Sequence, residues 1–314
     1  MYKLAITILF GLALWACTKS PLSDIDIYDF RPESEIGVYD VSQKDCELMG
    51  YRQVIRSDSP IGCGRLKRVV FNFYPLLPNP TEKSNATSSN KGATSINQTS
   101  TIKTPEKGAI IVLDVVAAEV LDLFTELYQL HFPIESAIPI EYFTKKERLA
   151  DDMNNTLAFD SRPITGGNKW SEHAYGVAID INPLQNPYLH IDKHSKAVVI
   201  PKDATEGYLN RAKYRAGKPI RKGMSEDITT VFAKHGFAVW GGDWNAPIDY
   251  MHFQVGTRQF INRLVSLPVK EAKLLFNQYV SLLNQCFKEN TLINNPTHLR
   301  KYCVDRVTPA FGSQ

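Results

Sequence analysis

The chain has little of what marks several large protein classes. Its 36 Lys and Arg stand against 33 Asp and Glu, and a net charge of +3 is too mild to indicate nucleic acid or a strongly anionic partner. No long apolar run lies inside the chain, which disfavours a protein that crosses a membrane many times. No segment repeats at a fixed period, which disfavours a repeat protein. The 314 residues can bury a substantial core, as one large domain or two modest ones.

Cysteine is also scarce, with five residues, and no Cys-x-x-Cys spacing occurs. This disfavours a zinc site built from cysteines. Apart from Cys17, the four that remain predict two disulfides outside the cytosol, with three possible connectivities. We favour the pairs Cys46–Cys63 and Cys286–Cys303, because each closes a short loop at one end of the chain. On the loop-entropy model, each would stabilise the fold by about 3 kcal/mol.

The amino-terminal residues predict export. Lys3 precedes an apolar or small-residue segment, 4–16, that is too short for a comfortable membrane span and typical of a secretory signal. Residues 14–17, Leu-Trp-Ala-Cys, resemble a bacterial lipobox, which would put a lipid on Cys17 and anchor the protein to a membrane of the cell envelope. The residue after Cys17 is Thr18 and not an acidic residue. By resemblance to bacterial lipoproteins, this favours sorting to an outer membrane. Ordinary signal cleavage, giving a periplasmic or secreted protein, and an uncleaved anchor are the alternatives.

Composition divides the rest of the chain. Residues 79–106 are rich in Ser, Thr and Asn and nearly free of apolar side chains, which predicts a flexible low-complexity linker. We expect strands over 69–74 and 108–112, a helix capped by Asp114, a helix over 268–287, and a mostly irregular tail after it. The long connection 184–223 is typical of a binding loop. The predicted divisions are a signal peptide (1–17), a tether (18–36), an accessory segment (37–78), the linker (79–106), a main domain (107–265) and a C-terminal helix and tail (266–314).

Residues 171–183, SEHAYGVAIDINP, place a histidine, a glycine and an aspartate close together. From Val177 the residues alternate between an apolar face and a face that carries Asp180, which predicts a strand. A continuous helix would separate His173 from Asp180 by about 10 Å. Because zinc holds each ligand atom about 2 Å away, the chain must turn back between them to share one ion. Tyr175-Gly176 is the expected turn.

A second strand with the same pattern is expected at residues 251–255, with His252 and Gln254 on its polar face. Together, His173, Asp180 and His252 would give two imidazoles and a carboxylate, a set suited to one zinc ion with a fourth position left open. Asp249 lies where a carboxylate could act as general base. Each motif alone is close to chance expectation, and only their conjunction indicates a site.

The two motifs together resemble those of the M15-type zinc peptidases. Ser-x-His-x-x-Gly-x-Ala-x-Asp occupies residues 171–180, and Asp-x-x-His-Phe occupies 249–253, after Trp-Gly-Gly-Asp-Trp at 240–244. This family includes D-Ala-D-Ala carboxypeptidases and dipeptidases and the L-alanyl-D-glutamate endopeptidases of cell-wall lysis. The resemblance covers about residues 154–255, with 108–133 as its leading part. The aspartate base and the tryptophan motif are most similar to the endopeptidase branch.

The resemblance implies roles for individual residues. His173, Asp180 and His252 would be the ligands of one zinc ion, and Asp249 the general base. Arg162 matches an upstream arginine that clamps a substrate carboxylate, although the residues around it, Phe-Asp-Ser-Arg-Pro, depart from the usual pattern. Ser171 would hydrogen-bond the substrate or orient the site. Structural roles for Arg162 and Ser171 are the alternatives.

The resemblance also implies a fold and a function. The fold would be α+β, a small antiparallel sheet carrying the zinc site on one face with helices packed on the other, similar to hedgehog and D-Ala-D-Ala peptidase domains. The function would be hydrolysis of amide bonds in peptidoglycan stem peptides, either D-Ala-D-Ala or L-Ala-D-Glu. The partners would be that peptide and a membrane, through Cys17, with no nucleic acid. A cell-wall-binding lipoprotein that keeps zinc without turnover is the alternative, and the presence of Asp249 disfavours it.

Overall fold

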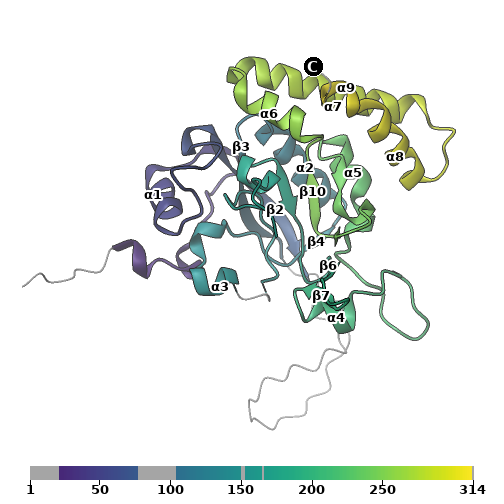
Figure 1. The fold of residues 1–314 in the computed structure, drawn as a ribbon, viewed down its shortest axis with the longest axis horizontal. Coiled ribbons are helices and arrows are strands. Elements are labelled where there is room, and N and C mark those ends of the chain that lie inside the picture. The colour runs from purple at the N-terminus through teal and green to yellow at the C-terminus, as the bar shows by residue number, and fades with distance from the viewer. Residues whose placement is uncertain (1–20, 77–103, 150–152, 165, 313–314) are drawn as a thin grey trace, which may run out of the picture.

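A computed structural model describes residues 21–76, 104–149, 153–164 and 166–312. The predicted signal peptide, Cys17 and all but residues 104–106 of the predicted linker lie outside these residues. The fold is α+β, with small antiparallel sheets and several helices, as predicted (Figure 1). None of the helices in the described part of the chain is long and apolar enough to span a membrane.

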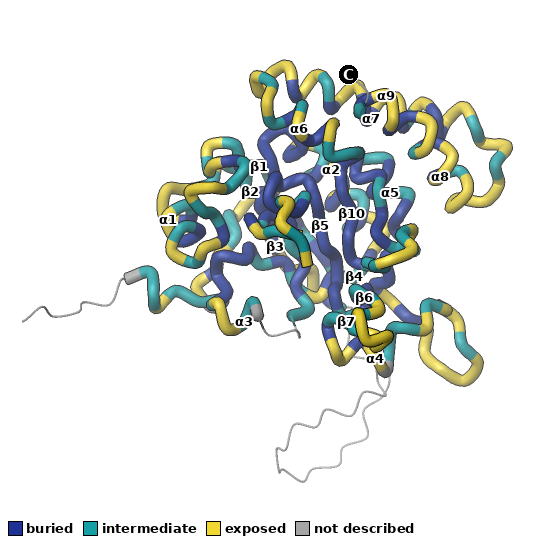
Figure 2. Tube along the Cα trace, viewed as in Figure 1, coloured by how far each residue is buried: buried dark blue, intermediate teal, exposed yellow. Residues whose placement is uncertain are grey.

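The first sheet forms the centre of the core. Strand β2 (Leu66–Pro75) lies between β1 (Gly37–Asp40) and β3 (Glu106–Leu113), antiparallel to both, and β4 (Pro133–Ile134) pairs with its end in parallel. Helix α2 (Ala117–Gln129) covers the sheet, and Phe124 stacks on Phe71 at 3.7 Å between ring centroids. The strands expected over 69–74 and 108–112 are therefore present, as parts of β2 and β3. Figure 2 shows β2 and β3 as mostly buried.

The other two sheets are smaller and antiparallel. In one, β10 (His252–Gln254) lies between β5 (Ala178–Asp180) and β8 (Val239–Trp240). Helix α5 (Thr229–Lys234) packs behind β10, where Phe232 stacks on Phe253 at 3.9 Å. In the other, β6 (Tyr188–Ile191) lies between β7 (Ala197–Ile200) and β9 (Ile248–Asp249). The connection 184–223, expected to be a loop, therefore contains a β-hairpin.

The prediction of a mostly irregular C-terminal tail is wrong. After α6 (Arg258–Ser266) and α7 (Val269–Glu289), the chain forms α8 (Pro296–Val307) and α9 (Pro309–Gly312), all along one side of the molecule (Figure 1). Asn295 caps α8 by accepting a hydrogen bond from the backbone N–H of His298 at 3.0 Å, and proline is favoured in the first turn that follows. The disulfide Cys286–Cys303 joins α7 to α8.

The remaining elements are short. They are η1 (Pro21–Asp24), η2 (Ile27–Asp29), α1 (Gln43–Tyr51), η3 (Cys63–Arg65), η4 (Ile140–Tyr142), α3 (Lys145–Leu149), η5 (Glu172–Tyr175), α4 (Ala204–Gly207), η6 (Ser225–Asp227) and η7 (Gly241–Asp243). The disulfide Cys46–Cys63 joins α1 to η3, so both predicted disulfide pairs are confirmed. Asp114 does not cap α2, because its carboxylate pairs with Arg65 at 2.8 Å.

The turn after η5 is fixed by the first sheet. Gly176 has a φ of +64°, a left-handed conformation that costs glycine little, and its carbonyl accepts a hydrogen bond from Leu113 N at 2.9 Å. A Cβ at Gly176 would lie 2.6 Å from the nitrogen of Leu113. The end of β3 thus lies directly against the predicted turn, and only glycine fits between them.

Candidate metal centre

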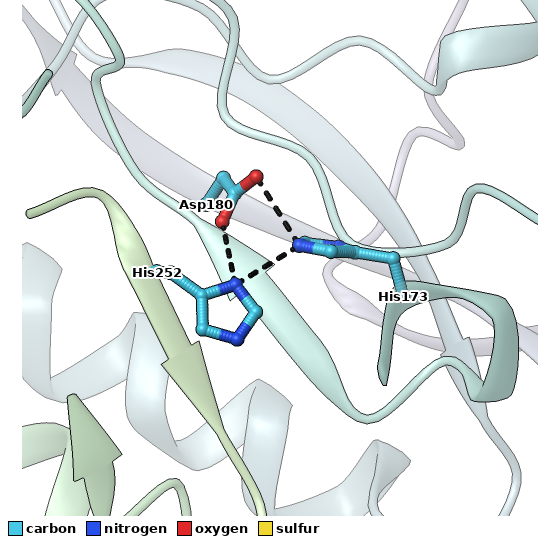
Figure 3. Close-up of side chains that lie close together, drawn as sticks. All are labelled: His173, Asp180 and His252. Atoms are coloured by element: carbon cyan, nitrogen blue, oxygen red, sulfur yellow. Dashed lines mark hydrogen bonds and ion pairs between the residues drawn. The ribbon is translucent and has the colours of Figure 1, made fainter. Parts of the chain in front are cut away.

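Three side chains from two motifs converge on one point (Figure 3). His173 Nε2 lies 3.2 Å from Asp180 Oδ2 and 3.2 Å from His252 Nδ1, and His252 Nδ1 lies 3.1 Å from Asp180 Oδ1. All three residues are buried. The structure therefore brings together the three residues that the sequence predicts as metal ligands.

The backbone explains this convergence. Asp180 in β5 and His252 in β10 are directly paired across the second sheet, so their side chains share one face. His173 comes from η5, whose first turn is capped by Ser171: the hydroxyl of Ser171 accepts a hydrogen bond from His173 N at 3.4 Å. The left-handed Gly176 then reverses the chain into β5. Ser171 thus supports the backbone that carries His173.

Each imidazole is held by a hydrogen bond on the side away from the cluster. His173 Nδ1–H donates to the carbonyl of Ala158 at 2.6 Å, and His252 Nε2–H donates to the side-chain oxygen of Gln254 at 2.9 Å. The amide group of Gln254 donates in turn to Gly256 O at 3.4 Å, which assigns its oxygen to the histidine. When both rings are neutral, these bonds leave the unprotonated nitrogens His173 Nε2 and His252 Nδ1 facing the cluster, the arrangement typical of metal-binding histidines.

The arrangement fits a cation. Two nitrogen lone pairs and a carboxylate 3.1–3.2 Å apart repel one another unless a positive charge lies among them. Ligand atoms at about 2 Å from a tetrahedral zinc ion lie roughly 3.3 Å from each other, close to the observed spacing. Two imidazoles and one carboxylate are also a donor set that zinc accepts while keeping a fourth position open.

The electrostatics of the cluster favour positive charge. Burial lowers the pKa of His252, but Asp180 beside it more than compensates and raises it to about 9. Burial alone would raise the pKa of Asp180, yet His173 and His252 hold it well below its usual range. Without a metal ion, the three groups therefore retain a proton at neutral pH. A zinc ion bound by all three residues would supply the positive charge that this proton supplies.

Asp249 borders this cluster. It ends β9, three residues before His252, and its Oδ1 is a buried atom without a hydrogen-bond partner among the described residues. Burial and the nearby charge of Asp180 raise its pKa to about 7, against the opposing effects of His252, His173 and Arg162. A carboxylate of this kind gains or loses a proton near neutrality, as a general base must.

Arg162 lies near Asp249 and Tyr188. Its side chain is 44% exposed, and its Nε lies 3.4 Å from Asp160 Oδ2. Its charge acts to lower the pKa values of both Asp249 and Tyr188, so the guanidinium lies near both groups. The exposed donors leave it able to bind a further carboxylate.

The tryptophans of the second motif differ in position. Trp244 lies beside the cluster, with its ring 5.4 Å from that of His252. Trp240 is buried, donates to Tyr250 O at 2.9 Å and packs on Phe253. Only Trp244 of this pair therefore borders the candidate metal centre, while Trp240 belongs to the core.

Two groups that hold the histidines were missed from sequence. The backbone carbonyl of Ala158 has no sequence signature, because any residue supplies one. Gln254 did carry a signal, since it shares the polar face of its strand with His252 and lies two residues away.

One comparison with known proteins gives a match. Residues 165–255 match a family model described as D-alanyl-D-alanine carboxypeptidase, of the M15 peptidases. The matched segment is less than a third of the chain, and contains His173, Asp180, Asp249 and His252 but not Arg162. No curated protein and no solved structure matches the chain.

Proposed function

Since residues 165–255 match a family model of the M15 peptidases, we propose that this protein is an exported zinc peptidase that hydrolyses amide bonds in peptidoglycan stem peptides. The single observation that carries the proposal is the convergence of two imidazole nitrogens and a carboxylate within 3.2 Å, with the carboxyl group of Asp249 near them. A fold similar to that of hedgehog and D-Ala-D-Ala peptidase domains is part of the proposal.

His173 Nε2, His252 Nδ1 and the Asp180 carboxylate would hold one zinc ion. Bound there, zinc lowers the pKa of water and polarises the carbonyl under attack. The chain contributes the orientation: Ala158 O and Gln254 fix the two rings, and Ser171 supports the turn that carries His173. Such outer contacts hold ligands in place and keep the correct nitrogen free.

Asp249 is the proposed general base. It would take the proton of the attacking water and deliver it to the leaving amine, a role suited to a carboxyl group whose pKa is about 7. Arg162, 44% exposed and near enough to lower the pKa of Asp249, would bind the substrate carboxylate next to the scissile bond. Both D-Ala-D-Ala ends and L-Ala-D-Glu links carry such a carboxylate, so Arg162 serves either substrate.

Export and lipidation at Cys17 belong to the same proposal. The disulfides Cys46–Cys63 and Cys286–Cys303 favour an oxidising compartment. A cell-wall-binding lipoprotein that holds zinc without turnover is the competing function. The buried Oδ1 of Asp249, which has no hydrogen-bond partner in the described part of the chain, favours the enzyme, because zinc binding does not require it.

The test is digestion of purified muropeptides read by mass spectrometry, with metal analysis of the same samples. We expect the wild type to contain one zinc per chain and to release either D-alanine or a peptide beginning with D-glutamate. His173→Ala should lose zinc and activity, whereas Asp249→Asn should keep zinc and lose activity. Zinc-loaded wild type that cuts none of the stem peptides would leave the binding function as the better account.

A further inference from the structure

Positive charge is concentrated in one stretch of the chain. Residues 188–223 hold nine Lys and Arg and three Asp and Glu, a surplus of six positive charges, while the whole chain has a surplus of three. The rest of the protein is therefore slightly acidic. The mild net charge, which by itself gave no sign of an anionic partner, conceals a strongly basic segment that we call the basic arm.

The arm is fixed at its base and exposed beyond it. Arg211 pairs with Glu226 through two hydrogen bonds, at 2.7 and 2.5 Å, and Lys213 pairs with Asp227 at 2.8 Å. Arg221 is buried and donates to Gly207 O. The loop between these anchors projects from the body of the molecule and is mostly exposed (Figure 2).

Six cations of the arm form no ion pair with an acidic side chain among the described residues: Lys193, Lys196, Lys202, Arg215, Lys218 and Lys222. All except Arg215 are exposed. Surface cations without partners cost little in water and remain free to pair with an incoming anion. Arg211, Lys213 and Arg221 form contacts within the protein, whereas these six cations are available to a ligand.

The arm begins in β6, which pairs with β9, the strand that carries the proposed general base Asp249. In β6, Tyr188 is paired directly with Asp249 of β9, and Leu189 is paired with Ile248. The guanidinium of Arg211 lies over the ring of Tyr250, 4.3 Å from its centre. A long anionic chain bound by the arm would therefore run toward the candidate metal centre.

Exposed apolar side chains accompany the free cations. Tyr214 is 71% exposed, Ile220 is 53% exposed and Ile191 is 64% exposed. Between Tyr214 and Ile220 the sequence places Arg215 and Lys218, so apolar and cationic groups alternate. This mixture suits a polymer that has both sugar rings and carboxylates. A membrane surface would be met better by a continuous apolar face.

We propose that the basic arm binds the peptidoglycan polymer, pairing its unpartnered cations with stem-peptide carboxylates next to the peptide that enters the metal centre. This inference rests on the proposed function for its choice of polymer. It adds a second binding surface, separate from the zinc ligands and from Arg162, that holds the enzyme on an insoluble substrate.

The test is co-sedimentation with purified insoluble peptidoglycan. The arm variant carries Lys202→Ser, Lys218→Ser and Lys222→Ser, and the matched control carries Lys270→Ser, Lys273→Ser and Lys288→Ser, three exposed lysines of α7. Every protein also carries His173→Ala, so that the polymer is not cut. Circular dichroism and thermal melts establish that both variants are folded.

We expect the arm variant to bind about five-fold more weakly than the control at low salt, as three lost surface ion pairs imply, and the difference to shrink at high salt. Polymer whose carboxylates have been converted to neutral amides should bind both variants equally weakly. Equal binding of the two variants to native polymer would overturn the proposal. So would a loss confined to vesicles of anionic phospholipid, which would identify a membrane surface instead.

The assay separates the two proposals. Binding is read in a variant without catalysis, so a protein that cuts no muropeptide can still give the arm-dependent result. Conversely, if the wild type cuts muropeptides and the arm and control variants bind the polymer alike, the proposed function is supported and the role of the arm is contradicted.

Discussion

Arg300 donates its Nη2 to both carboxylate oxygens of Asp243, at 2.9 and 2.6 Å, across 57 residues of chain. Arg300 lies in α8, is almost fully buried, and places its guanidinium 5.8 Å from the centre of the Trp240 ring. Asp243 ends η7, and the next residue, Trp244, lies beside the ring of His252. A helix outside the segment that matches the family model thus supports the wall of the candidate metal centre.

The two halves of this ion pair should not be equally costly to remove. Asp243→Asn leaves a buried guanidinium without its counter-charge and should cost about 3 kcal/mol of unfolding free energy. Arg300→Met leaves a carboxylate that is 40% exposed and can be solvated, so its cost should be clearly smaller. Urea unfolding of both variants measures the difference, and a larger loss for Arg300→Met would contradict the assigned burial.

Gln254 should control zinc affinity without touching the ion. Gln254→Leu removes the acceptor that holds His252 Nε2–H, and should weaken zinc binding by roughly 10- to 100-fold. Gln254→Glu keeps an acceptor oxygen at the same place and should bind zinc at least as well as the wild type. Competition with a chromophoric chelator gives both affinities. Equal affinity for the wild type and Gln254→Leu would exclude this role.

Asp249 should account for the acid limb of the activity profile. A carboxylate base works only when unprotonated, so kcat/KM falls as the pH drops through its pKa. Burial and Asp180 raise that pKa to about 7, and a bound cation opposes the rise, which places the limb at or below pH 7. Asp249→Asn should lose about 10²- to 10⁴-fold in kcat while keeping its zinc.

Measurement of kcat/KM between pH 4.5 and 9, with zinc content checked at each pH, tests this assignment. The zinc check is needed because protonation of His173 or His252 would release the ion and imitate the limb. An Asp249→Asn variant with wild-type kcat would remove Asp249 from the mechanism.

Glu141 should make the fold less stable as the pH rises. Its side chain is fully buried, neither carboxylate oxygen has a hydrogen-bond partner in the described structure, and burial raises its pKa to about 8. The unfolded chain releases this proton near pH 4.5, so between about 4.5 and 8 the folded state binds more protons. Stability supplied by protonated Glu141 is therefore lost progressively over that range.

Urea unfolding of the wild type and Glu141→Gln across pH 5 to 9 measures this effect. The variant keeps a neutral side chain of similar size, so its stability should fall less with pH. Glu271→Gln, at an exposed carboxylate of α7, is the control and should follow the wild type. Parallel curves for the wild type and Glu141→Gln would show that Glu141 is ionised in the folded state.

Local patterns predicted the parts of the site that depend on local geometry. Alternation placed His252 on the polar face of its strand and Phe253 on the core face, and the need to turn back between His173 and Asp180 located the left-handed Gly176. Both disulfide pairs followed from loop length. These features depend on residues near one another in sequence, where few arrangements compete.

Features set by distant partners were not predictable in the same way. Asp114 precedes a helix and has a capping residue type, but Arg65, 49 residues earlier, takes its carboxylate. The strand β6 pairs on one side with β9, about 60 residues later, and only its hairpin with β7 is local. The helix α8 differs, because its start signal, Asn295-Pro296, is local and present in the sequence.

The contact of Gly176 with Leu113 bears on how this protein could be divided. The turn between the first two proposed ligands takes its shape from a strand more than fifty residues before the matched segment begins. Cutting the gene at residues 165 and 255 would leave that turn with an unsatisfied carbonyl and an exposed flank. The segment that matches the family model is thus smaller than the unit that folds, and any shortened version of this protein must keep β3 with the motif.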